Sequence, residues 1–286
     1  MPARRMWTFF EPLHAVTYFA PEAKEHFERT GLRGFWRGYF AGRAAPLGAV
    51  ESPPVIAAFF NFAPQMVRRA LPAVWSLADP DRALRARQEG AVAALQRLLV
   101  QYDSHPEGKA QIAEAADLLM EAASHVDTGG RILAAANAAL AVPAEPLARL
   151  WHAATVLREH RGDGHVAALV AWELDGCSVL AWRASLDLSR DILQPARGWS
   201  DEEWLAATQR LKARGWLDTE GRATDEAVEA HREIEAVTDR VSMQPWEKLG
   251  PDKADRLVKL LWPMASAAYN DIPDWNPIGL PSPLVE

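Results

Sequence analysis

The sequence of 286 residues predicts a mainly α-helical protein with two similar halves. Alanine, leucine, arginine and glutamate recur at helical spacing, and alternating runs of β-branched residues are scarce. The halves are predicted by repeated motifs: Glu11-Pro12-Leu13 recurs as Glu145-Pro146-Leu147, and Lys24-Glu25-His26 is matched by Arg158-Glu159-His160, each pair 134 residues apart. An internal duplication explains both pairs, and chance similarity between Ala/Arg-rich helices is the alternative.

The length exceeds the usual single-domain size of about 100–150 residues. We therefore divide the chain into a first repeat at residues 1–100, a helical connector at 101–144, a second repeat at 145–250, and a C-terminal helix with an extended, proline-rich tail at 251–286. Two related helical units in one chain form a groove between them, and grooves of this kind are common ligand sites.

Proline and glycine mark the helices of the first repeat. Pro21 opens a helix that ends at Gly31, and residues 35–45 form an aromatic helix. Further helices begin near Pro53 and Pro64. The connector starts with a loop and continues with an amphipathic helix and an alanine-rich helix.

The second repeat has the clearest local pattern. After a polar, loop-like stretch come a helix at 165–173, a turn, a helix at 177–184 and a loop. A capping box of Ser and Glu three residues apart then opens a long helix at 201–214. A short two-stranded wing at 216–224 and a helix at 225–241 complete the unit.

This order of elements resembles MarR-type winged-helix regulators over residues 160–242, most closely from Leu211 to Gly221. The chain as a whole resembles a family of actinobacterial helix-turn-helix proteins without a firmly assigned activity, through residues 11–19, 42–48 and 158–165. The resemblance implies that both halves are diverged winged-helix-like units. It implies a fold more than a function.

The predicted recognition helix is poorly suited to DNA. Its first turn, which would meet the bases, is acidic, and its cations lie at the far end. The acidic residues are Asp201, Glu202 and Glu203, and the cations are Arg210, Lys212 and Arg214. Residues 1–100 carry 13 Lys/Arg against 8 Asp/Glu, whereas the whole chain has a net charge of −7, so the first half offers the better surface for phosphates.

The composition predicts a cytoplasmic protein. A single cysteine, Cys177, cannot form an intramolecular disulfide. The N-terminus lacks the apolar run of a secretory signal, and no stretch is long and apolar enough to span a membrane. Phosphate-binding loops, dinucleotide-binding glycine motifs and serine-nucleophile motifs are also absent from the sequence.

Several polar side chains are candidates for a site. His14 and Tyr18 stand four residues apart on one helix face, which suits two ligands or an acid/base pair; a structural pair at a helix interface is the alternative. Arg43 belongs to an aromatic helix, and arginine among aromatic rings suits a planar anion; packing of its aliphatic stem on the core is the alternative.

The densest polar cluster is the loop-like stretch at residues 158–165. Its candidates are His160, Arg161, Asp163 and His165. His160 and His165 are possible metal ligands, although their spacing matches no established zinc pattern. For Asp163, capping of a helix that begins at His165 is the alternative.

The tail contains four closely spaced prolines and is predicted to be extended, with Trp275, Ile278 and Leu280 as anchors. It could dock on its own chain or, as we slightly favour, on a second subunit in a homodimer.

The sequence therefore predicts a small-molecule-binding, winged-helix-type protein with a pocket between its halves, and a ligand-responsive regulator is one form that such a protein takes. The hypothesised pocket residues are His14, Tyr18, Arg43, His160, Arg161, Asp163 and His165. The alternatives are an enzyme that uses a metal or planar cofactor at the His160/Asp163/His165 cluster, and a DNA-binding regulator of MarR type.

Overall fold

The computed structural model describes residues 3–274, 276–280 and 282–283, and it confirms a mainly α-helical fold. None of the helices in this described part has the length and apolar character needed to cross a membrane. The helices are α1 (Ala3–Phe19), α2 (Pro21–Arg29), α3 (Phe35–Ala44), η1 (Ala45–Leu47), α4 (Ser52–Ala58), α5 (Pro64–Ala70), η2 (Ala73–Ser76), α6 (Pro80–Leu98), α7 (Val100–Asp103), α8 (Pro106–Ser124), α9 (Ile132–Ala138), α10 (Pro146–Ala171), α11 (Gly176–Arg183), α12 (Arg190–Arg197), α13 (Asp201–Ala213), α14 (Asp225–Val241), α15 (Gln244–Leu249) and α16 (Pro251–Tyr269).

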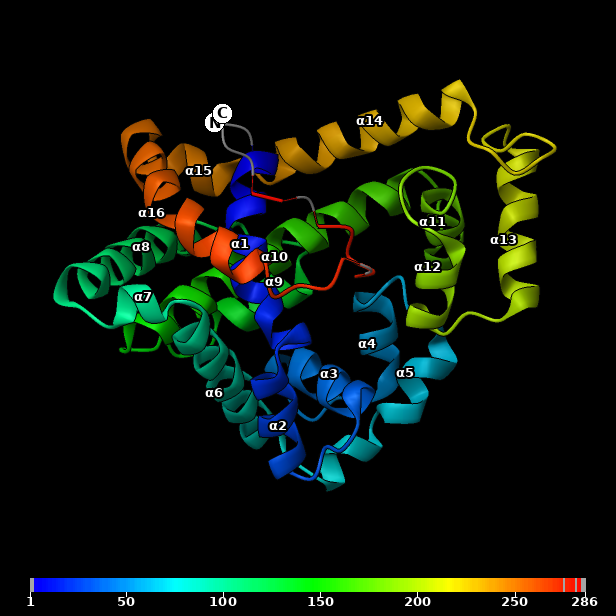
Figure 1. The fold of residues 1–286 in the computed structure, drawn as a ribbon. Coiled ribbons are helices and arrows are strands. Elements are labelled where there is room, and N and C mark those ends of the chain that lie inside the picture. The colour runs from blue at the N-terminus through cyan, green and yellow to red at the C-terminus, as the bar shows by residue number, and fades with distance from the viewer. Residues whose placement is uncertain (1–2, 275, 281, 284–286) are drawn as a thin grey trace.

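The long helix α10 is the central element of the fold (Figure 1). Its 26 residues extend about 39 Å at 1.5 Å per residue. It packs against α1, α6, α8, α9 and α14. The largest core joins α1, α6, α8, α10, α15 and α16, and it buries Phe9, Leu119, Trp151 and Leu261. The connector helix α8 is therefore part of the main core.

The prediction of a loop at residues 158–165 is wrong, because α10 continues through these residues. The N-terminus of α10 is stabilised in two ways: Pro146 occupies the first turn, and the Glu145 carboxylate accepts hydrogen bonds from two backbone N–H groups. Glycine at position 164 leaves room for the Arg131 guanidinium, since a Cβ there would lie 2.4 Å from Nη1 of Arg131 and displace it. Tertiary packing thus outweighs the low helix propensity of glycine.

Two smaller helical units flank this centre. Helices α3, α4, α5 and α6 enclose a core rich in phenylalanine, including Phe40 and Phe59. Helices α11, α12, α13 and α14 enclose a core built on tryptophan, in which the rings of Trp182 and Trp216 lie 4.5 Å apart between centroids. Figure 1 shows α11–α13 at one end of the molecule and α7 and α8 at the other.

The second unit follows the predicted order with two differences. The structure places the short helix α12 where the sequence predicted only a loop, and the predicted wing is reduced to an isolated antiparallel bridge between Leu217 and Ala223. The capping box is formed as predicted: Glu203 N–H donates to Ser200 Oγ at 3.2 Å, and Ser200 N–H donates to Glu203 Oε2 at 2.9 Å.

The two units touch where α11 begins. A Cβ on Gly176 would lie 2.1 Å from the carbonyl oxygen of Phe60, so the two backbones approach as closely as only glycine allows. Nearby, the Trp199 indole donates a hydrogen bond of 2.9 Å to the carbonyl of Asn61. These contacts fix the second unit against the first.

The repeated sequence motifs occupy different positions in their helices. The first copy, at residues 11–13, lies inside α1, whereas residues 145–147 start α10. Likewise, residues 24–26 belong to the short helix α2, but residues 158–160 lie in the middle of α10. Internal duplication therefore stays a prediction.

The described residues of the tail pack on their own chain. Ile272 and Leu280 are buried in a small cluster with Ala15 of α1. Asn276 shapes the turn by accepting hydrogen bonds from the backbone N–H groups of Ile278 and Gly279. The predicted anchor Trp275 lies outside the described residues. The homodimer stays a prediction, but these tail contacts do not need a partner subunit.

We expect Gly176→Ala to destabilise the fold by about 1–3 kcal/mol, because the added methyl group forces the backbones of the two units apart. Gly162→Ala is the matched control inside α10, where no neighbouring atom outside the local helix lies closer than 3.8 Å. It should stabilise the protein by up to about 1 kcal/mol through helix propensity. Urea unfolding of both variants measures the difference, and equal effects would contradict it.

Candidate functional site

A buried cluster of charges joins α1, α3 and α10. The Glu159 carboxylate accepts two hydrogen bonds from the Arg43 guanidinium, both 3.2 Å long. The Arg158 guanidinium lies 2.8 Å from the same carboxylate and 3.5 Å from the Glu11 carboxylate. Only 2% of each glutamate side chain is exposed. The two arginines are therefore already matched by the two glutamates.

Burial and charge oppose each other in this cluster. Burial alone would raise the pKa of Glu159, but Arg158 and Arg43 outweigh it and hold this pKa well below its usual range. Burial dominates at Glu11 and raises the pKa of its carboxyl group. Glu159 is thus the firmly ionised centre of the cluster.

The predicted pair His14 and Tyr18 lies beside this cluster. The His14 ring is buried, with Nε2 at 2.9 Å from Tyr18 Oη and Nδ1 at 2.9 Å from Thr155 Oγ1 of α10. Burial, followed by the charge of Arg158, lowers the pKa of His14 well below 6.5. The ring is therefore neutral near pH 7.

A cavity of about 180 Å³ opens next to the charge cluster, between the two helical units. Four of the predicted residues line it, namely Tyr18, Arg43, Asp163 and His165. Seven further aromatic side chains line it: Phe19, Phe35, Trp36, Tyr39, Phe59, Phe60 and Phe62. Its shape and lining suit a planar apolar group.

Arg197 adds a positive charge to this cavity. It is the last residue of α12, and its guanidinium lies 4.8 Å from the ring centroid of Phe62. Among the described residues, no Asp or Glu forms an ion pair with Arg197; its long-range polar contact is a weak 3.5 Å hydrogen bond to the carbonyl of Pro277. Burial lowers its pKa to about 10, so it remains charged at pH 7.

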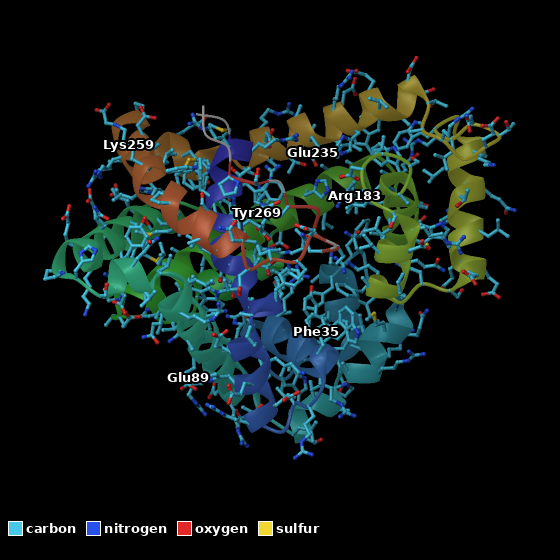
Figure 2. The ribbon with its side chains drawn as sticks, viewed as in Figure 1. Phe35, Glu89, Arg183, Glu235, Lys259 and Tyr269 are labelled. Carbon is cyan, nitrogen blue, oxygen red and sulfur yellow. The ribbon has the colours of Figure 1, made fainter. Side chains whose placement is uncertain are left out.

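The tail covers the cavity. Pro277 and Ile278 line both it and a second cavity of about 390 Å³ that shares Arg158 and Arg197 with the first. Arg183 of α11 donates to the Ile278 carbonyl at 3.3 Å. Figure 2 shows Phe35 and Arg183 on either side of the tail.

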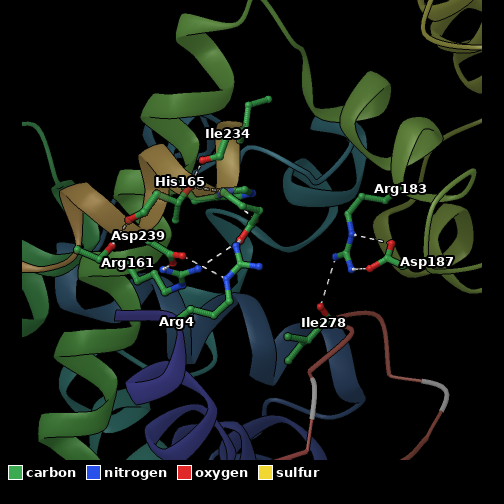
Figure 3. Close-up of polar contacts among 11 residues, drawn as sticks. Arg4, Arg161, His165, Arg183, Asp187, Ile234, Asp239 and Ile278 are labelled. Carbon is green, nitrogen blue, oxygen red and sulfur yellow. Dashed lines mark hydrogen bonds and ion pairs between the residues drawn. The ribbon is translucent and has the colours of Figure 1, made fainter. Parts of the chain in front are cut away.

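The polar stretch of α10 serves mainly to hold neighbouring elements. Asp163 does not cap a helix at His165; its Oδ2 accepts hydrogen bonds from two N–H groups at the start of α9, each 2.9 Å long. Arg161 pairs with Asp239 of α14 at 2.7 Å, as Figure 3 shows. The backbone carbonyl of His160 accepts from Arg131. The helical spacing of these residues thus points them at different partners.

The described residues form no cluster of metal-binding side chains. Within the described part of the chain, no group of three or more His, Cys, Asp and Glu side chains could hold a metal ion. His165 Nδ1 contacts Thr238 at 2.9 Å, and His160 points elsewhere. His160 and His14 are not brought together: His14 faces Thr155, whereas the Nε2 of His160 is buried without a hydrogen-bond partner among the described residues.

The predicted DNA-facing surface of α13 is acidic, and its cations are engaged. Arg210 pairs with Asp175 at 2.9 Å, and Lys212 donates to the carbonyl of Thr219 at 2.8 Å. In the wing, Arg222 pairs with Asp218 at 2.9 Å. In contrast, α5 of the first unit exposes two arginines with no ion pair in the described structure, Arg68 and Arg69.

Sequence reasoning missed Arg197 and the rings at residues 59–62 in the cavity, and the role of Glu159 beside it. Arg197 gives no local signal, because it reads as an ordinary cation at a helix end. Glu159 lies between Arg158 and His160 of the repeated motif, and no local pattern indicates its pairing with Arg43. Together with the predicted aromatic helix at residues 35–45, the aromatic run at residues 59–62 is a signal for a wall of rings.

A family model described as a helix-turn-helix family matches residues 3–272. No curated protein and no solved structure matches the chain.

Buried histidines should make the fold sensitive to acid. Burial lowers the pKa of His152, His160 and His165 to about 4. Below about pH 6.5 the unfolded chain therefore takes up protons that the folded chain does not, so stability falls between pH 6.5 and 4. The raised pKa values of Glu11 and Asp163 favour the folded state as the pH falls. These two groups are fewer than the four histidines with lowered pKa values, because His14 adds to the three named above.

We expect urea titrations at pH 7, 6 and 5 to show this loss, and His160→Gln to reduce it by about 1–2 kcal/mol at pH 5. His105→Asn is the control, since His105 is exposed and asparagine keeps its N-cap role on α8. An unchanged pH dependence in H160Q would contradict the assignment.

Proposed function

The chain belongs to a helix-turn-helix family, and we propose that it is a ligand-binding member that holds a planar, anionic small molecule in the aromatic cavity between its two helical units. The observation that carries the proposal is Arg197, a half-buried cation that has no carboxylate partner among the described residues and lies against the aromatic wall of the cavity. A carboxylate or similar anion would supply the missing charge, and the rings would stack on its planar part.

The position of Arg197 supports a regulatory role. It ends α12, and residues 198–200 lead directly into α13, the predicted recognition helix. The same turn is held by residues that directly follow the cavity wall in sequence: the Arg197 carbonyl accepts from Ala63 N–H at 2.9 Å, and Gln65 donates to the Gly198 carbonyl and to Glu203. An anionic ligand that pairs with Arg197 and shifts the end of α12 would therefore change the orientation of α13.

The order of helices supports the duplication as part of this proposal. In the first half α3, α4, α5, η2 and α6 follow one another, and in the second half α11, α12, α13, the wing and α14 do so. The cavity takes most of its aromatic residues from the first series and Arg197 from the second, and α10 and the tail complete its wall. A closer relationship to MarR-type regulators and a cytoplasmic location remain part of the proposal.

Duplex DNA binding is a second candidate function, and the exposed arginines of α5 favour it. Arg68 and Arg69 are exposed and have no ion pair among the described residues, whereas α13 begins with Asp201 and Glu202. DNA would then contact the first unit, at the helix that corresponds in order to α13.

The ligand proposal is tested with benzoate and its neutral analogue benzamide in isothermal titration calorimetry. We expect benzoate to bind more tightly, and Arg197→Gln to weaken benzoate about ten- to a hundredfold with little effect on benzamide, because a hydrogen bond to a charged group contributes about 1.5–3 kcal/mol. Arg190→Gln on the same helix is the control, since Arg190 pairs with the exposed Asp201 outside the cavity. Equal binding of benzoate by wild type and R197Q would refute the assignment.

The DNA candidate is tested by fluorescence anisotropy with a duplex over a salt series. If α5 contacts the backbone, Arg68→Ala with Arg69→Ala should lower the slope of log affinity against log salt by about 2, as expected for two lost phosphate contacts. Arg210→Ala with Lys212→Ala on α13 should change it little. No binding at low salt, or loss only in the α13 variant, would rule out this surface.

A further inference from the structure

The hydrogen bonds around His14 run in one direction, and Trp151 sets that direction. Thr155 Oγ1 lies 2.9 Å from the carbonyl oxygen of Trp151, one turn earlier on α10. A carbonyl oxygen can only accept, so the hydroxyl proton of Thr155 is committed to it. Thr155 and Trp151 are both buried, so water does not compete for this proton.

The protonation of His14 follows from this. Nδ1 of His14 lies 2.9 Å from Thr155 Oγ1, whose proton is already used, so Nδ1 must carry a proton and donate it. Burial, followed by the charge of Arg158, keeps the ring neutral, so it holds only this one proton. Nε2 is then an acceptor, and the Tyr18 hydroxyl, 2.9 Å away, donates to it.

The oxygen of Tyr18 therefore has only lone pairs left to offer. Among the described residues, Tyr18 Oη makes no hydrogen bond besides the one to His14. The Tyr18 side chain lines the aromatic cavity, as do its neighbours Arg158, Tyr39 and Arg43. The Tyr18 hydroxyl can therefore accept a hydrogen bond from a ligand but cannot donate one to it.

We propose that Tyr18 is a specificity-determining residue that selects ligands carrying a hydrogen-bond donor. Resting on the proposed function, this defines the ligand class further: a planar aromatic acid whose anionic group meets Arg197 and whose ring carries an O–H or N–H group for Tyr18. Burying the ring against Tyr18 without such a donor leaves the phenol oxygen unsatisfied, which selects against plain aromatic acids.

One substitution should reverse the direction of the hydrogen bonds that link Thr155, His14 and Tyr18. Thr155→Val removes the group that accepts from Nδ1, while valine keeps the shape of the side chain. His14 can then place its proton on Nε2 and donate to Tyr18, whose own proton becomes free for the ligand. The variant should prefer ligands that carry an acceptor instead of a donor.

The tautomer is measured directly in the wild-type protein. Long-range ¹H–¹⁵N NMR spectra of histidine-labelled protein at pH 7.5 should show His14 protonated at Nδ1, and a His14→Gln sample assigns the signals. The same spectra of Thr155→Val should show the proton at Nε2. Protonation of His14 at Nε2 in the wild type would overturn the inference without any ligand being needed.

Ligand choice is measured by calorimetry with matched acids: 3- and 4-hydroxybenzoate carry a donor, 3- and 4-fluorobenzoate have nearly the same shape without one, and 3- and 4-methoxybenzoate carry an acceptor. We expect at least one hydroxy acid to bind wild type about three- to tenfold more tightly than its fluoro partner, as one neutral hydrogen bond provides. Tyr18→Phe should abolish this preference, and Thr155→Val should shift it towards the methoxy acid.

The control variant is Tyr102→Phe, which removes a phenol from α7 outside the cavity and should leave the preference intact. Equal binding of hydroxy and fluoro acids to wild type, with benzoate still dependent on Arg197, overturns this inference and leaves the proposed function standing. If none of the acids binds wild type, the proposed function is wrong and the inference falls with it.

Discussion

The structure depends on the buried Glu159 carboxylate and the two guanidinium groups that hold it. Arg43 brings α3, in the first unit, to α10, and Arg158 links the same carboxylate to Glu11 of α1. Removing charges from water is costly, and the cluster persists because each of the two carboxylates has a guanidinium partner. Breaking one partner would leave an uncompensated buried charge, which costs about 3–5 kcal/mol.

The two arginines and two glutamates of this cluster match each other, so the charge that a ligand would meet in the neighbouring cavity comes from another residue. Arg197 is the cation left over, and in the described structure a carbonyl of the tail meets it instead of a carboxylate. A carbonyl is a weaker partner for a guanidinium than an anion. The tail and an anionic ligand would therefore compete for the same donors, and entry of a ligand would involve the segment that covers both cavities.

The helix-turn-helix family supplies the scaffold, but the polar chemistry of this chain is concentrated between its units. The helix that would read DNA begins with carboxylates, and its cations are bound to neighbouring groups. The turn that precedes it is instead hydrogen-bonded to Asn61 of the cavity wall and to Gln65 of α5. Fold and function can separate in this way, since a site depends on particular side chains rather than on the family architecture.

The sequence by itself determined the helical class, the capping box at Ser200 and Glu203, and the placement of His14 and Tyr18 on one helix face. Each is a local pattern, set within three or four residues. Only the tertiary structure decided that residues 158–165 are helical, because the contact that favours Gly164 comes from the distant Arg131. It also decided that Arg43 meets Glu159 and that Arg158 meets Glu11, since each pair lies more than a hundred residues apart and no local spacing encodes it.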